Sequence, residues 1–282
     1  MTIATLPLRG PNTVQMPPVG VGTWRMGEDP AQASAEVAAL HRALDLGFTH
    51  FDTAEMYGEG GAEEVLGRAI AGHDREGLFL CSKVYPWNAG RRDMVAACEA
   101  SLARLGTDRI DLYLLHWPGG VPFAETLEAA GQLLDEGKIA AFGVSNFDTE
   151  GLQGLIDAGQ ADLIAVNQVM HNIPNRGPEH DLFPLMKRHD IAAVAYCPLE
   201  IAPTRRIDGI EEIAETEGLS VAQLALAWHM TRGLAVPIPK SSTPAHVEEL
   251  WTAANHRLSA ETLAAIDARA PAPDRPVPLQ VR

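Results

Sequence analysis

Apolar residues in this chain occur in short runs that alternate with longer amphipathic patterns. Eight runs rich in Val, Ile, Leu and Ala have the length of strands, and they cover residues 19–24, 47–52, 78–82, 110–115, 139–144, 163–166, 191–195 and 234–239. Between them, apolar side chains recur every three or four positions, which is typical of helices. These patterns cover residues 30–46, 63–71, 92–105, 123–136, 149–158, 182–189, 210–217 and 221–230, and another begins near residue 244. A unit of strand followed by helix thus repeats with a period of about 30 residues.

Strands that are apolar on both faces and alternate with helices indicate a parallel sheet covered by helices. With eight such units, the predicted fold class is α/β, a closed (β/α)8 TIM barrel that forms one domain over residues 1–282. An open doubly wound sheet is the alternative, but the chain lacks a glycine-rich phosphate loop at its first turn. A turn signal within residues 6–18 predicts a short N-terminal β-hairpin. Four prolines within residues 271–282 predict an extended C-terminal tail.

Composition restricts the partners and the compartment. A formal net charge of -15 argues against a nucleic acid or an anionic membrane as partner. The chain has neither an N-terminal targeting pattern nor an apolar run of about 20 residues, so we expect a cytoplasmic protein. Cys81, Cys98 and Cys197 are too scattered for a disulfide framework or a zinc site. We therefore expect buried free thiols and no metal.

The familiar nucleotide-binding motifs are absent from the sequence. Glycines at positions 20 and 22, and again at 58 and 60, resemble the start of a dinucleotide-binding loop, but Arg25 and Glu63 stand where the third glycine is needed. The glycine before Gly137 and Lys138 has the wrong spacing for a P-loop. Any nucleotide must therefore be bound without a Rossmann or P-loop motif.

Several apolar runs end on polar residues, and such positions meet at one end of a barrel. Lys83 closes a buried run, and Asp52 on the neighbouring strand can supply the counter-charge that a buried ammonium needs. Lys83 beside Tyr57 would lower the pKa of the phenol and make it a proton donor near neutral pH. His116 could then orient a carbonyl oxygen that receives a hydride. The structural alternative is a buried ion pair with two unrelated aromatic residues at the rim.

A second group of strand-end residues has the chemistry of a nicotinamide site. Ser145, Asn146 and Gln168 offer donors and acceptors for a carboxamide, although they could equally cap loops. Tyr196 could stack on a flat ring or simply pack. Residues 238–244 end a strand and begin a helix, and their lysine, hydroxyl groups and free backbone N–H groups suit a phosphate.

With these residues assembled, the chain resembles the aldo-keto reductases from about residue 19 to about residue 263. Residues 47–58, 82–83, 111–118, 143–147, 167–168 and 238–241 carry the resemblance. It implies a catalytic tetrad of Asp52, Tyr57, Lys83 and His116. It also implies an extended NADPH, held by Ser145, Asn146, Gln168, Tyr196, Pro198, Leu199, Lys240, Ser241, Ser242, His246 and Glu249.

Two departures from the pattern of the family weaken the preference for NADPH over NADH. Many members of the family carry Arg and Asn where this chain has His246 and Leu250. A histidine is a weaker and pH-dependent partner for the 2′-phosphate than an arginine. We still expect NADPH as cofactor because of Lys240 and Ser241, with NADH as the alternative.

The resemblance also suggests a substrate. Residues 26–29, 85–90 and 175–177 are similar to a bacterial subgroup that includes methylglyoxal-reducing enzymes. We expect an NADP-dependent oxidoreductase that reduces aldehydes or ketones, such as small 2-oxoaldehydes, with Tyr57 as proton donor. The pocket would be lined by Trp24, Tyr85, Trp87 and Trp117. The short connection between residues 196 and 210 and the short tail favour an open pocket.

Two other classes of function remain. A non-catalytic barrel that binds nicotinamide and senses redox state would predict tight NADPH binding without turnover. A glycoside hydrolase needs two facing carboxylates, whereas Asp52 and Glu55 belong to one strand. From the family resemblance we expect a monomer whose partner is a small carbonyl compound.

Overall fold

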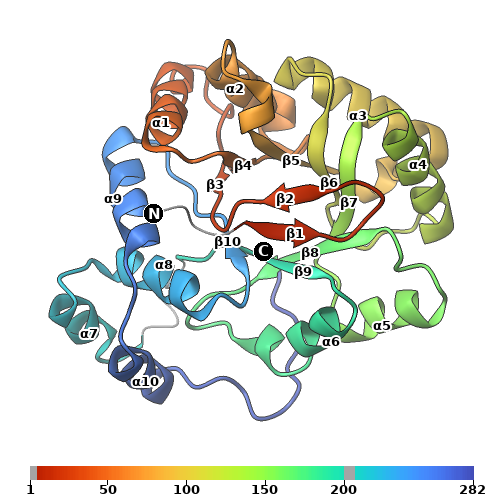
Figure 1. The fold of residues 1–282 in the computed structure, drawn as a ribbon. Helices are drawn as coiled ribbons and strands as arrows, with labels where there is room; N and C mark the ends of the chain where they lie inside the picture. Colours follow the sequence, from red (N-terminus) through yellow and green to blue (C-terminus); the bar gives the residue numbers. More distant parts are fainter. Residues whose placement is uncertain (1–4, 200–206) are drawn as a thin grey trace.

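The eight predicted strands form one parallel sheet that closes on itself. A computed structural model describes residues 5–199 and 207–282, and Figure 1 shows its ribbon. Neighbouring strands in the sheet follow chain order, namely β3 (Val21–Gly22), β4 (His50–Asp52), β5 (Phe79–Val84), β6 (Ile110–Leu115), β7 (Ile139–Ser145), β8 (Ile164–Met170), β9 (Ala192–Tyr196) and β10 (Val236–Pro237). Gly22 pairs with Lys240 in a parallel bridge, which joins the first strand to the last. The predicted (β/α)8 barrel is confirmed.

Helices surround the barrel. They are α1 (Ala33–Leu46), α2 (Gly61–Ile70), α3 (Arg91–Leu105), α4 (Phe123–Asp135), α5 (Thr149–Asp157), α6 (Leu182–Arg188), α7 (Ile210–Thr216), α8 (Val221–Arg232), α9 (Pro244–Asn255) and α10 (Ala260–Arg269). In the described part of the chain, every helix is too short or too polar to cross a membrane.

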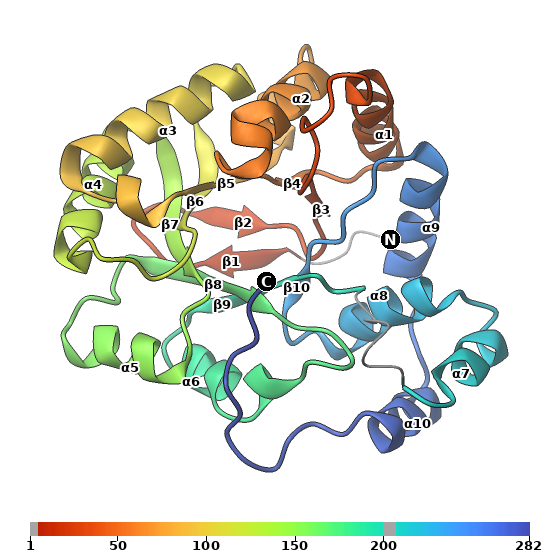
Figure 2. The same cartoon turned by 180° about the vertical axis from the view of Figure 1, so that it is seen from behind.

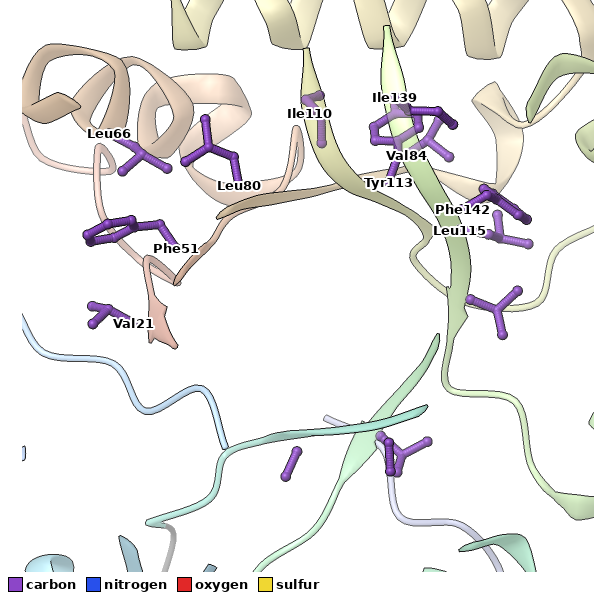
Figure 3. Packing of buried hydrophobic residues seen from close by; sticks show 14 of the residues in the cluster. Val21, Phe51, Leu66, Leu80, Val84, Ile110, Tyr113, Leu115, Ile139 and Phe142 are labelled. Carbon is purple, nitrogen blue, oxygen red and sulfur yellow. The ribbon is translucent and has the colours of Figure 1, made fainter. Parts of the chain in front are cut away.

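The strands sort their side chains into two apolar layers because successive residues point to opposite faces. Phe51, Leu80 and Tyr113 face outward and pack against the helices, as Figure 3 shows for Leu80 and Leu66 of α2. Phe79 and Leu112 face inward and fill the barrel. This packed interior leaves room for a site only at the ends of the strands.

The predicted N-terminal hairpin closes one end of the barrel. Strands β1 (Leu6–Leu8) and β2 (Val14–Met16) are antiparallel. Leu8, Val14 and Met16 belong to the same apolar cluster as the inward-facing residues of the sheet. Figure 1 shows the hairpin lying across the barrel opening. Any cavity that admits a ligand must therefore lie at the other end.

Three sequence expectations need correction. The first helix begins at Ala33 rather than near Pro30, because Asp29 turns the chain by accepting from the backbone N–H groups of Ala31 and Gln32. Helix α10 was not anticipated. Cys197 is only half-buried, although Cys81 and Cys98 are buried as expected, and none of the three forms a disulfide within the described residues. Part of the connection expected to leave the pocket open, residues 200–206, lies outside the described residues.

Candidate active site

A cavity of about 510 Å³ lies at the carboxyl ends of the strands, opposite the hairpin. It brings together most of the residues singled out in the sequence: Trp24, Asp52, Tyr57, His116, Trp117, Ser145, Asn146, Gln168, Tyr196, Pro198, Leu199 and Lys240. Lys83 is fully buried and does not line the cavity, but its ammonium is bonded to Asp52 and Tyr57, which do. The remaining candidates, Tyr85, Trp87, Ser241, Ser242, His246 and Glu249, are not among the lining residues.

Asp52 and Lys83 form a buried ion pair on neighbouring strands. Asp52 is paired with Cys81 across the ladder, so Lys83, two residues further on, projects from the same face of the sheet. The ammonium Nζ donates to Asp52 Oδ1 at 2.5 Å and to the carbonyl oxygen of Thr53 at 2.8 Å. Burial alone would lower the pKa of Lys83, but the attraction of Asp52 outweighs it and raises the pKa. Lys83 is therefore a permanent cation.

Tyr57 is carried by a tight turn directly after β4. Lys83 Nζ donates to the Tyr57 hydroxyl at 3.3 Å and lies 4.9 Å from the centre of the phenol ring. Gly58 has a φ of 57°, and a Cβ at this position would lie 2.9 Å from the backbone of Gly27. Only glycine satisfies both constraints without strain. The sequence thus fixes the turn that aims Tyr57 at the cavity.

The pKa of Tyr57 differs from the sequence expectation. Burial raises the pKa of the phenol, and the nearby charge of Lys83 only partly opposes this. The expected lowering of the pKa is therefore wrong, because removing the phenolate from water destabilises it more than the adjacent cation stabilises it. Tyr57 keeps its proton at neutral pH, as a proton donor must.

His116 completes the tetrad from the end of β6. Its ring lies edge-on to Tyr57 with the two centroids 5.7 Å apart, and its backbone N–H donates to the carbonyl oxygen of Val84. Burial, assisted by the charge of Lys83, lowers the pKa of His116 to about 2. The imidazole is therefore neutral at physiological pH and can act as a hydrogen-bond donor without carrying charge.

The amide residues are tied to the tetrad by hydrogen bonds. Gln168 Nε2 donates to Asp52 Oδ2 at 2.8 Å, and Ser145 Oγ donates to the carbonyl oxygen of Gln168 at 2.8 Å. Asn146 Nδ2 donates to the carbonyl oxygen of His116 at 3.1 Å, and the Tyr196 hydroxyl donates to Asn146 Oδ1 at 2.9 Å. The link between Gln168 and Asp52 was missed in the sequence because 116 residues separate the two.

The far end of the cavity suits an anion. Lys240 lies beside Gly22 with much of its side chain exposed. The part that is buried loses contact with water, and this is the main cause that lowers the pKa of Lys240. Helix α9 begins four residues after it, and its first turn presents free backbone N–H groups. His246 is exposed on this helix, whereas Leu250 is buried in the core, which explains an apolar residue at that position. The hydroxyl of Ser241 is hydrogen-bonded to the backbone of Thr243.

Comparison with known proteins agrees with this geometry. The model of the aldo/keto reductase family matches residues 18–270. The chain belongs to the aldo/keto reductase family. It is 46% identical over 266 residues to methylglyoxal reductase YeaE of Escherichia coli (strain K12), which covers 92% of this chain and 93% of that protein.

Two further relatives extend the comparison. Glyoxal reductase of Bacillus subtilis (strain 168) is 36% identical over 259 residues, covering 91% of this chain and 90% of that protein. The crystal structure of an aldo/keto reductase from Klebsiella pneumoniae in complex with NADP and acetate is 44% identical. It superposes with a TM-score of 0.92 and covers 99% of this chain and 100% of that one. The predicted family and fold are both confirmed.

Of the four aromatic residues expected to line the pocket of this aldo/keto reductase, two line the cavity and two lie outside it. Trp24 and Trp117 line the cavity, whereas Tyr85 and Trp87 stack on each other with centroids 4.3 Å apart and meet Trp117 edge-on. Glu55 holds this outer pair in place, since its Oε1 accepts from the backbone N–H of Tyr85 at 2.7 Å and from Asn88 Nδ2 at 3.1 Å. This role of Glu55 was not predicted from the sequence.

Four lining residues were not predicted for the site from the sequence: Gly22, Met56, Cys197 and Arg282. Met56 precedes Tyr57 and Cys197 follows Tyr196, so both could have been found as neighbours of predicted site residues. Arg282 has no predicted site residue as a neighbour in the sequence, because only the path of the tail brings it to the barrel.

Proposed function

We propose that this aldo/keto reductase reduces aldehydes and ketones to alcohols with NADPH, and that small 2-oxoaldehydes such as methylglyoxal are its substrates. The observation that carries the proposal is the Asp52, Lys83, Tyr57 and His116 arrangement. It presents a protonated phenol and a neutral imidazole on one cavity, with the buried cation directly behind the phenol. These are the groups that a carbonyl oxygen needs when it gains negative charge.

The proton path follows from these contacts. The bound dinucleotide supplies a hydride to the carbonyl carbon. The Tyr57 hydroxyl gives its proton to the carbonyl oxygen, and the electron pair left on the phenol oxygen is stabilised by Lys83 at 3.3 Å. Asp52 keeps Lys83 charged and in place. His116 donates a hydrogen bond to the same substrate oxygen and so orients the carbonyl group.

The donor set supports a nicotinamide dinucleotide. Ser145, Asn146 and Gln168 supply amide and hydroxyl groups at one end of the cavity, Tyr196 supplies a ring, and Lys240 supplies a cation at the other end. The Klebsiella pneumoniae structures are complexes with NADP and with NADPH. We infer the same cofactor for this chain, with a higher kcat/KM for NADPH than for NADH. A kcat/KM for NADH equal to or above that for NADPH would overturn this preference.

The substrate class rests on the relatives and on the wall of the cavity. The two relatives named above reduce methylglyoxal and glyoxal according to their names. The indole rings of Trp24 and Trp117 give the cavity flat apolar surfaces that suit small planar dicarbonyl compounds. Turnover of methylglyoxal no better than that of an unactivated aliphatic aldehyde would exclude this substrate class.

The decisive measurement follows NADPH absorbance with an aldehyde panel headed by methylglyoxal, on the native chain and on Tyr57→Phe. We expect the substitution to lower kcat by about 100-fold or more, the effect of losing a general acid. Tyr113→Phe is the matched control, because it removes a buried phenol hydroxyl outside the cavity and should leave kcat unchanged. Full activity in Tyr57→Phe would exclude Tyr57 as the donor. NADPH binding without turnover in the native chain would favour a redox sensor instead.

A further inference from the structure

The C-terminal tail, residues 271–282, leads from α10 to the mouth of the active-site cavity. Figure 2 shows it running from α10 towards the centre of the barrel. Val277 lies against Gly177, where an added Cβ would approach the Val277 side chain to 2.8 Å. Leu279 packs on the main apolar core. These two contacts fix the direction of the tail, so that its end reaches the cavity.

At the cavity the tail places the side chain of Arg282 between Trp24 and Cys197. The Arg282 guanidinium carbon lies 4.9 Å from the centre of the Trp24 ring, and Nη1 lies 3.9 Å from Cys197 Sγ. Trp24 follows β3, and Cys197 follows β9. Because β9 lies between β8 and β10 in the sheet, the contact with Cys197 places the arginine between Gln168 and Lys240.

The position along the cavity indicates which anion the arginine meets. Asn146 follows β7 and Gln168 lies in β8, whereas Lys240 follows β10, so β9 separates these two ends of the cavity. An extended dinucleotide with its carboxamide at the first end and its 2′-phosphate at the second must carry its diphosphate across the middle. Among the described lining residues, Lys240 and Arg282 are the two with permanently cationic side chains. In a chain of net charge -15, a diphosphate needs such a local cation.

The tail can also move. It contains neither helix nor strand, and most of its residues are exposed. Segments with few buried contacts and little hydrogen-bonded structure open at low free energy. A cation on such a segment can leave the cavity while the cofactor enters and return afterwards.

We propose that Arg282 binds the diphosphate of the dinucleotide, and that the tail is a strap that closes over the bound cofactor. The proposal rests on the proposed function, since it takes the NADPH site as given. It adds a cofactor-binding residue that lies outside every motif of the barrel. It also assigns the tail a role in the release of the cofactor.

The test uses the full chain with Arg282→Gln, and with Arg275→Gln as a matched control, because Arg275 is an exposed arginine of the same tail that does not line the cavity. The Kd of NADPH is measured by fluorescence titration, and its dissociation rate by stopped-flow displacement. A charge-assisted hydrogen bond predicts a Kd about tenfold higher and correspondingly faster release in Arg282→Gln, with no change in Arg275→Gln. The difference in the Kd of NADPH between Arg282→Gln and the native chain should be smaller at high salt, because salt screens the attraction between arginine and diphosphate.

A second probe separates the diphosphate from the other anions. Adenosine 2′-monophosphate carries only the phosphate assigned to Lys240, so Arg282→Gln should bind it as tightly as the native chain does. An unchanged Kd for NADPH would overturn the proposal. So would a rise confined to the KM of a carboxylate-bearing aldehyde such as glyoxylate, which would assign Arg282 to the substrate. Failure of the native chain to bind NADPH would instead refute the proposed function.

Discussion

The tetrad can be compared with a second buried charged cluster in the same protein. This cluster, called here the Arg176 cluster, consists of His171, Arg176, Glu179, Arg232 and Asp267, and it joins the segment after β8 to α8 and α10. Both groups contain nearly fully buried ion pairs, at 2.5 Å for Lys83 and Asp52 and at 2.8 Å for Arg176 and Glu179. Burial and ion pairing therefore do not by themselves identify a reactive site.

The two clusters differ in how their polar atoms are used. In the Arg176 cluster, all three side-chain nitrogens of Arg176 donate to Glu179, Asp267 or the carbonyl oxygen of Ala270. In the tetrad, the Tyr57 hydroxyl and the His116 ring line a cavity that can hold a reactant. Polar atoms that are paired within the protein, like those of Arg176, hold elements together, whereas polar atoms that face the cavity can exchange protons with a ligand.

The largest expected contrast comes from removing one cation from each cluster. Lys83→Met should lower the free energy of unfolding by about 3–5 kcal/mol, because it leaves Asp52 buried without a cation. Arg176→Met should lower it by less, because Glu179 keeps its bonds from Arg232 and His171. Only Lys83→Met should also lower kcat, by about 100-fold or more, because the phenolate then lacks its cation. Urea unfolding and kcat at saturating NADPH measure the two effects.

Lys187→Met, at an exposed lysine of α6, is the control and should change neither quantity. Should Arg176→Met be too unstable to purify, Asp267→Asn, at the more exposed acceptor of the cluster, is a milder probe of the same contacts. A loss of kcat per folded molecule in either variant as large as in Lys83→Met would show that the comparison is wrong.

A smaller contrast is expected in the dependence of stability on pH. The pKa of His116 is lowered from 6.5 to about 2 by burial, so its stabilising effect is complete above pH 6.5 and is lost as the pH falls. For Glu179, burial alone would raise the pKa, but bonds from His171 and Arg176 lower it from 4.5 to about 2. Its contribution is therefore complete above pH 4.5 and is lost only below that value.

Urea titrations at pH 7.5, 5 and 3.5 separate the two windows. Between pH 7.5 and 5, the free energy of unfolding should fall by about 1–2 kcal/mol less in His116→Gln than in the native chain. Glu179→Gln should reduce only the fall in this free energy below pH 4.5. Because His116 stays neutral, kcat should show no histidine ionisation between pH 5 and 8. An inflection near pH 6.5 that disappears in His116→Gln would contradict the neutral imidazole.

The smallest expected effect tests which aromatic residues belong to the substrate site. Trp117→Ala removes a lining residue and should raise the KM for an aromatic aldehyde about tenfold, whereas Trp87→Ala, at a side chain 61% exposed, should raise it less than about threefold. Neither change should alter the KM for NADPH. Equal effects would mean that the substrate site extends over the outer pair of Tyr85 and Trp87.

Much of this protein follows from local sequence alone. The order of the eight sheet strands and of the helices up to α9 was predictable because buried strands and amphipathic helices have different periods in the chain. The helix ends at Gly47, Gly106 and Gly137 were predictable because these glycines adopt positive φ at no steric cost. The meeting of Asp52, Tyr57, Lys83 and His116 was predictable because the carboxyl ends of parallel strands meet at one end of a barrel.

Other features were decided only by tertiary structure. The bond from Gln168 to Asp52, the raised pKa of Tyr57 and the low pKa of His116 depend on how completely water is excluded where distant strands meet, and no local pattern encodes that exclusion. The arrival of Arg282 beside Trp24 depends on the path of a tail without secondary structure. Local periodicity determines which elements form, whereas contacts between residues far apart in sequence arise only when the closed barrel brings them together.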